Sequence, residues 1–221
     1  MDVVETLKRR KSTRAFLPCS VDREVIEQIL AAARQAPSGA NTQPWQVAVV
    51  SGERKRQLQQ RLERAFRDGA AAGMDYLYYP TEWSEPYRSR RRECGLQLYN
   101  ALHIQRQDKE RQREQWAANY RAFDAPVALF FFMEAGLQTG SFLDYGMFLQ
   151  SLMLAAVEQG LATCPQAALA EYPAIVKQAL GYPDNSILIC GMALGYEDSD
   201  APVNQYRTGR QEVEAFTRWF E

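Results

Sequence analysis

Residues 141–160 read SFLDYGMFLQSLMLAAVEQG, and this pattern predicts a helix that is apolar on nearly every side. Ser141 and Asp144 have the S-x-x-D spacing of a capping box, which predicts where the helix begins. Gly160 suits the position just after a last helical turn. Because a helix without a polar face must be covered by other elements, we predict that this one is central and buried.

The segments on either side of this helix supply the rest of the fold. Apolar runs predict strands at residues 46–50, 126–133 and 186–194. Further patterns predict helices at about residues 2–11, 20–36, 53–72, 87–104, 108–121, 172–180 and 211–220. An irregular aromatic and helical excursion is expected at about residues 73–122. We therefore predict a single α+β domain over residues 1–221, with a buried sheet wrapped by helices.

Composition limits the classes of function. The 221 residues are 46% hydrophobic and 24% charged, with a net charge of −1, so no overall field attracts nucleic acid or a membrane surface. The N-terminal sequence MDVVETLKRRK has no apolar signal-peptide core. The apolar run APVALFFFM is about half the length of a membrane helix. Four cysteines without a CxxC pair indicate thiols in a reduced cytosol.

The single histidine restricts the possible chemistry. A zinc site built on several histidines is excluded, and we expect no metal. A Ser-His-Asp or Cys-His site would have to use His103, which lies in a mixed polar and apolar helical stretch. His103 therefore has the features of an ordinary surface or boundary residue.

Two basic clusters, far apart in sequence, are candidates for an anion site. In LKRRKSTRAF, Arg10 could donate two hydrogen bonds to a phosphate, with Ser12 and Arg14 as further donors. In NQYRTGR, the candidates are Arg207 and Arg210. The alternative for the first cluster is that its cations stabilise the C-terminal end of a helix. The sequence alone does not bring the two clusters together.

Three other segments need an explanation. APSGANTQPW holds polar turn residues between Pro37 and Pro44, more hydrogen-bonding capacity than a plain connection requires. GLATCPQAAL has small side chains around Pro165, which would let a flat ligand approach the backbone, or would form a tight connection between helices. RSRRREC could bind nucleic acid, but an arginine run in a chain of this net charge is typical of a solvated helix face.

Together, four segments resemble the signatures of the FMN-dependent nitroreductase family, in their expected order. They are RRKSTRAF, APSGANTQPW, DYGMFLQSLMLAAVEQGLATCPQAAL and MALGYEDSDAPVNQYRTGR. The resemblance covers about residues 3–220. YYPTEWSEPYRSRRRECG resembles, more loosely, the nitrobenzoate and nitroaromatic reductase branch. The resemblance implies a nitroreductase-like fold with a central mixed sheet, and a homodimer with two FMN molecules at the subunit interface.

The resemblance also implies which residues bind FMN. The matching positions are Arg10, Lys11, Ser12 and Arg14; Pro37, Ser38, Gly39 and Asn41, which would reach the FMN of the partner subunit; Pro165, Gln166, Ala167 and Ala168, which would lie along the flavin; and Arg207 and Arg210. Arg10, Arg207 and Arg210 would bind the phosphate, and Arg14 would lie near the pyrimidine edge or the ribityl chain. The Ala167 N–H would lie near N5. Family members often have a hydroxyl where this chain has Gly39 and Ala40.

The aromatic part of the excursion is a candidate for the substrate pocket. Tyr76, Tyr78, Tyr79 and Trp83 lie in a segment without helical or strand periodicity, broken by prolines. Such residues can stack on flat ligands and form a mobile cover. The alternative is that they form a packed surface excursion or a dimer contact.

These observations predict a cytosolic homodimeric flavoenzyme that uses NADH or NADPH to reduce a nitroaromatic, a quinone or a similar flat acceptor. No catalytic side chain is expected, because the flavin itself carries the hydride. The alternatives are reductive dehalogenation or ene-type reduction on the same fold, and a non-enzymatic flavin-binding module. We expect no nucleic acid or membrane partner.

Overall fold

A four-stranded sheet is the framework of the fold. In the computed structural model, which describes residues 2–221, the strands are ordered β1-β2-β4-β3. Their bounds are β1 Gln46–Ser51, β2 Val127–Glu134, β3 Ala162–Gln166 and β4 Ser186–Gly195. Each neighbouring pair is antiparallel, so the expected mixed sheet is wrong for these strands. β2 and β3 do run in the same direction, but β4 lies between them and pairs antiparallel with both.

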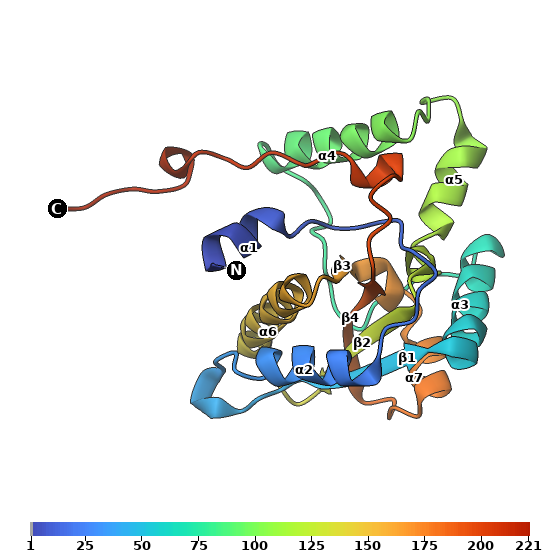
Figure 1. The fold of residues 1–221 in the computed structure, drawn as a ribbon, viewed down its shortest axis with the longest axis horizontal. Helices are drawn as coiled ribbons and strands as arrows, with labels where there is room; N and C mark the ends of the chain where they lie inside the picture. The colour runs from blue at the N-terminus through green and yellow to red at the C-terminus, as the bar shows by residue number, and fades with distance from the viewer. Residues whose placement is uncertain (1) are drawn as a thin grey trace.

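Helices cover both faces of this sheet, which gives three layers (Figure 1). The α-helices are α1 Val3–Arg9, α2 Arg23–Ala33, α3 Gly52–Arg67, α4 Tyr87–Ala101, α5 Lys109–Ala117, α6 Thr139–Glu158 and α7 Pro173–Leu180. The short 3-10 helices are η1 Gly39–Asn41, η2 Ala122–Asp124, η3 Ala167–Ala170, η4 Pro202–Asn204 and η5 Val213–Ala215. The helix expected to reach about residue 72 ends at Arg67, because Gly69 turns the chain with a φ of +73°.

The side chains of β2 alternate between two hydrophobic cores. Leu129, Phe131 and Met133 pack in the core that contains α2 and α6. Phe130 and Phe132 pack in the core that contains α3, η3 and α7. β2 is therefore apolar at consecutive positions because both of its faces are covered.

The α6 helix begins differently from the prediction. Its N-cap is Gln138, with no side-chain capping bond, so the Ser141–Asp144 capping box is wrong. The Asp144 carboxylate instead accepts a hydrogen bond of 3.2 Å from the Gly39 N–H, which belongs to a loop more than a hundred residues earlier. Gly160 follows the helix with a φ of +72°, as predicted.

One face of α6 remains open in the single chain. Phe148, Leu152 and Ala156 are buried against the sheet, whereas Leu143 is 72% exposed. A cavity of about 520 Å³ beside this face is lined by Pro37, Phe142, Leu143, Gly146, Met147, Gln150 and Ser151. The expectation of a helix buried on all sides is therefore wrong for the isolated chain. By length and hydropathy α6 could also span a membrane, but core helices of globular proteins pass the same test.

Two segments take a different form from the one expected. Residues 162–166, interpreted above as a close-approach segment or a tight connection, form edge strand β3. The expected last helix at residues 211–220 contains only the 3-10 turn η5, and the chain there runs away from the body of the molecule (Figure 1). Phe216, Trp219 and Phe220 are exposed on this arm, so nothing in the single chain covers an apolar helix face there.

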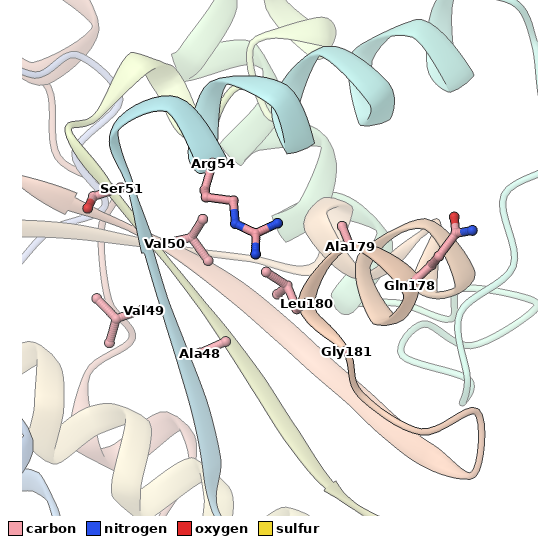
Figure 2. A pocket seen from close by; sticks show the side chains of 9 residues that line it. All are labelled: Ala48, Val49, Val50, Ser51, Arg54, Gln178, Ala179, Leu180 and Gly181. Carbon is pink, nitrogen blue, oxygen red and sulfur yellow. The ribbon is translucent and has the colours of Figure 1, made fainter.

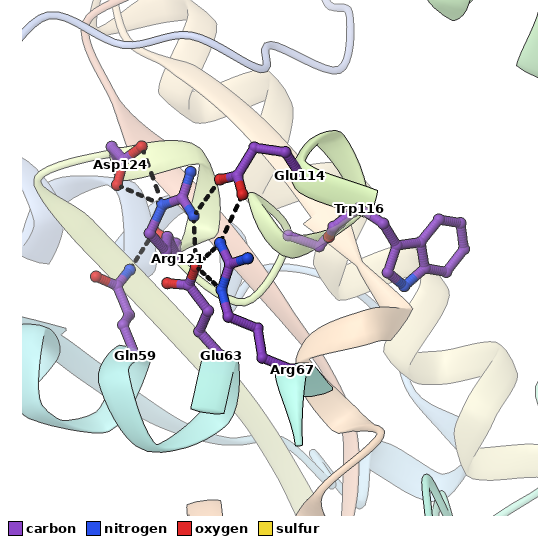
Figure 3. Close-up of polar contacts among 8 residues, drawn as sticks. Gln59, Glu63, Arg67, Glu114, Trp116, Arg121 and Asp124 are labelled. Atoms are coloured by element: carbon purple, nitrogen blue, oxygen red, sulfur yellow. Dashed lines mark hydrogen bonds and ion pairs between the residues drawn. The ribbon is translucent and has the colours of Figure 1, made fainter. Parts of the chain in front are cut away.

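The excursion leaves and rejoins the body through polar contacts. Where it leaves, the Asp75 carboxylate pairs with the buried Lys177 ammonium at 3.0 Å and accepts a 2.8 Å hydrogen bond from the Leu188 N–H. Where it rejoins, Arg121 pairs with Glu63 at 2.8 Å in a network that links α3, α5 and η2 (Figure 3). The excursion is therefore held firmly at both ends.

Candidate functional site

The first basic motif lies along β3. The Thr13 N–H donates a 3.0 Å hydrogen bond to the Thr163 carbonyl, and Ser12 forms an isolated parallel bridge with the same residue. Because α1 ends at Arg9, the chain leaves the helix and becomes extended where it meets the sheet edge. The structure thus brings Arg10 to Arg14 next to the segment around Pro165.

Asn204 joins this motif to the C-terminal region, and the sequence analysis did not include it. Its side-chain oxygen accepts a 2.8 Å bond from the Arg14 N–H, and its amide nitrogen donates to the carbonyls of Ala15 and Asp198, each at 2.8 Å. Asn204 is 2% exposed, so all of these bonds are shielded from water. An asparagine in this motif could indicate a fixed turn, which its bond to Asp198 confirms, but its other two partners, Arg14 and Ala15, are 190 and 189 residues away.

Three arginines gather at this junction; we call Arg10, Arg207 and Arg210 the arginine cluster. Burial lowers the pKa of Arg10, and the charges of Arg210 and Arg207 lower it further. The Arg207 guanidinium donates to the carbonyls of Lys8 and Arg9 at the end of α1. Arg210 bonds to the carbonyl and hydroxyl oxygens of Thr208, at 3.0 and 2.9 Å. An anion would relieve the repulsion among these cations.

Lys11 has a different environment from the arginine cluster. Its ammonium pairs with the Glu197 carboxylate at 2.6 Å and also donates to the Asn204 carbonyl. These contacts fasten the motif to the chain that follows β4. Lys11 therefore has partners of its own within the protein, whereas Arg10 faces other cations.

The segment after β3 lies unusually close to β4. A Cβ atom at Gly191 would stand 2.4 Å from the Leu169 side chain, so glycine is needed for η3 to pack on the strand. Near the same edge, the Thr163 hydroxyl and the side-chain amide oxygen of Gln166 are buried without a hydrogen-bond partner. The other end of the Gln166 amide donates to the Asn119 carbonyl at 2.9 Å. This edge thus presents small residues beside unpaired polar atoms.

The polar loop lies elsewhere. The Ser38 hydroxyl accepts a 2.9 Å bond from the Gln43 N–H, which closes the loop on itself. The Trp45 ring stacks on Phe148 with the centroids 4.8 Å apart, so Trp45 anchors the end of the loop to the core. The loop contacts the start of α6 through Asp144, whereas β3 follows the end of α6. These two ends are separated by roughly 20 Å of helix.

The predicted aromatic residues form a row of ring contacts. The Tyr76 ring lies 4.8 Å from that of Phe142 in α6 and 6.2 Å from Tyr78. The row continues from Tyr78 to Tyr79 at 4.6 Å and on to Trp83 at 5.6 Å. Tyr76 also donates a 2.7 Å hydrogen bond to a carbonyl of β4, so at this position the segment is fixed to the sheet.

Other features of the structure lie away from these residues. A groove of about 710 Å³ lies between β1 and α7, and none of the predicted site residues lines it (Figure 2). His103 is exposed and lies beyond the end of α4. Within residues 2–221, no group of three histidine, cysteine or acidic side chains is arranged to hold a metal ion.

The fold and these contacts define an α+β protein in which segments from both ends of the chain meet at one sheet edge and bring three arginines together. The chain belongs to the nitroreductase family, whose model matches residues 7–196.

Three similar proteins cover nearly the whole chain. It is 39% identical to a 4-nitrobenzoate reductase of Pseudomonas putida, over 95% of this chain and 92% of that protein. It is 37% identical to a nitrobenzene nitroreductase of Ectopseudomonas oleovorans, over 96% and 94%. The FMN and NADPH-dependent nitroreductase NfnB of Sphigopyxis sp. strain HMH superimposes with a TM-score of 0.97 at 40% identity, covering both chains completely.

Proposed function

We propose that this protein is an FMN-dependent oxidoreductase that reduces nitroaromatic compounds with NADPH or NADH. The observation that carries the proposal is the meeting of Arg10, Arg207 and Arg210 beside β3, in a chain similar over its full length to an FMN and NADPH-dependent nitroreductase. Bound FMN can be identified by its absorption spectrum and by chromatography after extraction. A purified protein that is colourless and does not take up FMN would refute the proposal.

The residues at the sheet edge fit FMN. The arginine cluster offers charge-assisted donors for a phosphate. The Thr163 hydroxyl and the Gln166 side-chain oxygen are buried and unpaired, and polar edges of a ligand could satisfy them. Pro165 is exposed and Ala167 is half-buried, so a flat ring could approach the chain at these two positions, whereas Ala168 packs in the core. When bound, the flavin would supply the hydride chemistry of the reaction.

The chain's own residues would then hold and orient the cofactor. Arg10, Arg207 and Arg210 would bind the phosphate, and Arg14 would place a positive charge near the ring or the ribityl chain. Ser12 would add a neutral donor, and Lys11 would position the motif through Glu197. The segment Pro165, Gln166, Ala167 and Ala168 would lie along the flavin, with the Ala167 N–H near N5.

The proposed site is completed by a second copy of the chain. The loop residues Pro37, Ser38, Gly39 and Asn41 lie near the start of α6, whereas the arginine cluster lies beside β3, which follows the end of α6, so we expect the loop of a second chain to reach the ligand. The open face of α6 and the exposed aromatic residues of the C-terminal arm are further apolar surface for such contact. Sedimentation should give twice the mass of one chain at low micromolar concentration. A stable, FMN-loaded monomer would contradict this arrangement.

The two substrates should exclude each other. A nicotinamide and a nitroaromatic are both flat and must stack on the same open face to exchange a hydride. We therefore expect parallel lines in double-reciprocal plots and competitive inhibition by the acceptor against the nicotinamide. Intersecting lines would show that both substrates bind together and would refute a shared pocket.

Turnover measurements with different acceptors can distinguish nitroaromatic reduction from the alternative functions. A nitroaromatic acceptor is supported by the similarity of the chain to a 4-nitrobenzoate reductase and a nitrobenzene nitroreductase. Activity toward a halophenol or an enone, without activity toward nitro compounds, would favour the dehalogenase or ene-type reductase. A flavin that is not reduced by either nicotinamide within seconds would favour a binding module. We propose a cytoplasmic location, without nucleic acid or membrane partners, for the reasons of composition given above.

A further inference from the structure

The first half of α4 carries exposed arginines that the proposed flavin site does not use. We call Arg88, Arg90, Arg91 and Arg92 the α4 arginines. Within residues 2–221, none of them forms an ion pair with a carboxylate. Surface arginines of the other helices usually do: Arg23 pairs with Glu27 at 2.7 Å, for example. Four cations within five positions repel one another, so this helix start would be stabilised by an anion.

Aromatic rings, rather than carboxylates, accompany the α4 arginines. The Arg91 guanidinium lies 5.3 Å from the centroid of the Trp83 ring, and that of Arg90 lies 5.4 Å from the Tyr87 ring. Arg88 donates two bonds, of 2.9 and 2.6 Å, to the Trp83 carbonyl and so fixes this corner. Exposed rings beside guanidinium groups suit a ligand that has both a flat base and a phosphate.

Among the described residues, the acidic side chains nearby form no ion pair with the α4 arginines. Glu85 accepts a 3.3 Å hydrogen bond from the Ser89 N–H, and Glu93 accepts one of the same length from the Gln97 amide. Glu82, which lies on the loop before α4, forms no ion pair with a described residue. The arginines therefore keep guanidinium donors available to an external anion.

The α4 arginines lie on the same side of the molecule as the proposed flavin site. α4 packs against η4, and the C-terminal segment that carries Arg207 and Arg210 passes beside it (Figure 1). Burial mainly raises the pKa of Tyr206, and Arg14 and the Cys94 side chain of α4 both lie close enough to influence it, so Tyr206 is a neighbour of both. Cys94 is about one helical turn from Arg91. The row of rings from Phe142 to Trp83 connects the start of α6 to the same corner.

We propose that Arg91 and Arg92 bind the 2′-phosphate of NADPH, with the adenine stacked on the exposed rings of Tyr79 or Tyr87. This inference rests on the proposed function, because it assumes that the nicotinamide end of the same molecule reaches the flavin. A dinucleotide is long enough for its two ends to occupy separate sites. The α4 arginines would then make the enzyme prefer NADPH to NADH, which lacks the 2′-phosphate.

The first test compares the two nucleotides as substrates of the FMN-loaded enzyme. In the double variant Arg91→Ala/Arg92→Ala, the KM for NADPH should rise about ten-fold or more, the effect of losing hydrogen bonds to a charged group. The KM for NADH and the kcat with either nucleotide should stay within about two-fold. The control Arg64→Ala, which removes an exposed arginine of α3, should change neither KM.

Each outcome of this comparison has a definite meaning. Wild-type enzyme that uses both nucleotides with equal KM, or a double variant that loses affinity for both equally, would overturn the inference and leave the proposed function intact. Absence of flavin reduction by either nucleotide would refute the proposed function itself.

The second test measures binding without turnover. Adenosine 2′,5′-bisphosphate should bind the FMN-loaded wild-type enzyme at least ten-fold more tightly than 5′-AMP, and the double variant should lose this difference. If the double variant still binds adenosine 2′,5′-bisphosphate more tightly than 5′-AMP, the 2′-phosphate binds at another site and the inference is overturned. Equal binding of the two nucleotides to the wild type would also overturn it.

Discussion

Two arginine-rich regions of this molecule have opposite electrostatics. In the network of Figure 3, the hydrogen bonds that Arg67 donates to the carboxylates of Glu114 and Glu63 raise the pKa of Arg67. Burial alone would lower the pKa of Arg121, but Asp124 and Glu63 outweigh it, so that pKa is also raised. In the arginine cluster, burial and the neighbouring arginines lower the pKa of Arg10.

The difference separates cations that hold the fold from cations that are available to a ligand. A paired arginine stabilises its carboxylate neighbours and is stabilised by them, so the protein alone satisfies it. A group of arginines without carboxylates is destabilised until an anion arrives, and binding gains that free energy. Substitutions should therefore change folding stability in the first region and ligand affinity in the second.

The largest effect is expected where a buried cation loses its anion. Asp75→Ala would leave Lys177, whose side chain is 6% exposed, without its carboxylate, and should lower the free energy of unfolding by about 3–5 kcal/mol. Urea denaturation at a fixed protein concentration measures this. The matched control Asp68→Ala removes an exposed partner of Arg64 and should cost less than about 1 kcal/mol. If the two variants lose similar amounts of unfolding free energy, burial does not determine how much an ion pair contributes to stability.

Lys55 is the case of a cation that is buried but poorly paired. Burial lowers its pKa from 10.5 to about 8, and Asp124 opposes this only in part. Between those two pH values the unfolded chain keeps a proton that the folded chain has lost, so stability should rise with pH. Lys55→Met should increase the free energy of unfolding at pH 7 by up to about 3 kcal/mol and remove the rise. If the free energy of unfolding of the wild-type protein does not change with pH across this range, the lowered pKa of Lys55 is disproved.

The arginine cluster should respond through the ligand. Arg10→Ala should weaken FMN binding by roughly 1.5–3 kcal/mol, the range for hydrogen bonds to charged groups. The unfolding free energy of the FMN-free protein should stay the same or rise, because a repelled cation is removed. Fluorescence titration with FMN measures the first effect, and Arg23→Ala is the control. Unchanged FMN affinity would remove Arg10 from the site.

The smallest effect is expected in the exposed part of the network. Glu114→Gln removes a carboxylate that pairs with Arg67 at 2.6 Å but is 53% exposed, so it should cost less than about 1 kcal/mol at low salt. The Arg67 hydrogen bond lowers the pKa of Glu114, so its contribution is present above the ordinary carboxyl pKa and disappears as pH falls through the lowered value. The variant should therefore lose a little of the wild type's acid sensitivity. If Glu114→Gln lowers the free energy of unfolding by the same amount at high salt as at low salt, the pair is not screened as an exposed ion pair should be.

The sequence predicted local structure best where one pattern dominated. The strands at β1, β2 and β4 and the helix that closes at Gly181 lie close to their predicted positions, because burial and a left-handed glycine act locally. The sequence did not predict β3, because Pro165 and the small residues around it show no strand periodicity. This segment is a strand because it pairs with β4 in the folded protein. The capping box was wrong because Asp144 finds a partner in a distant loop.

By itself, the sequence determined the kinds of residue available: two basic clusters, a polar loop, an aromatic excursion and one long apolar helix, with a single histidine. Only the tertiary structure decided which of these meet. It placed Arg10 beside Arg207 and Arg210, paired Lys11 with Glu197, and put the polar loop at the far end of α6. The physical reason is that contacts between residues nearly 200 positions apart depend on how the sheet and helices pack, and no local spacing in the chain records that packing.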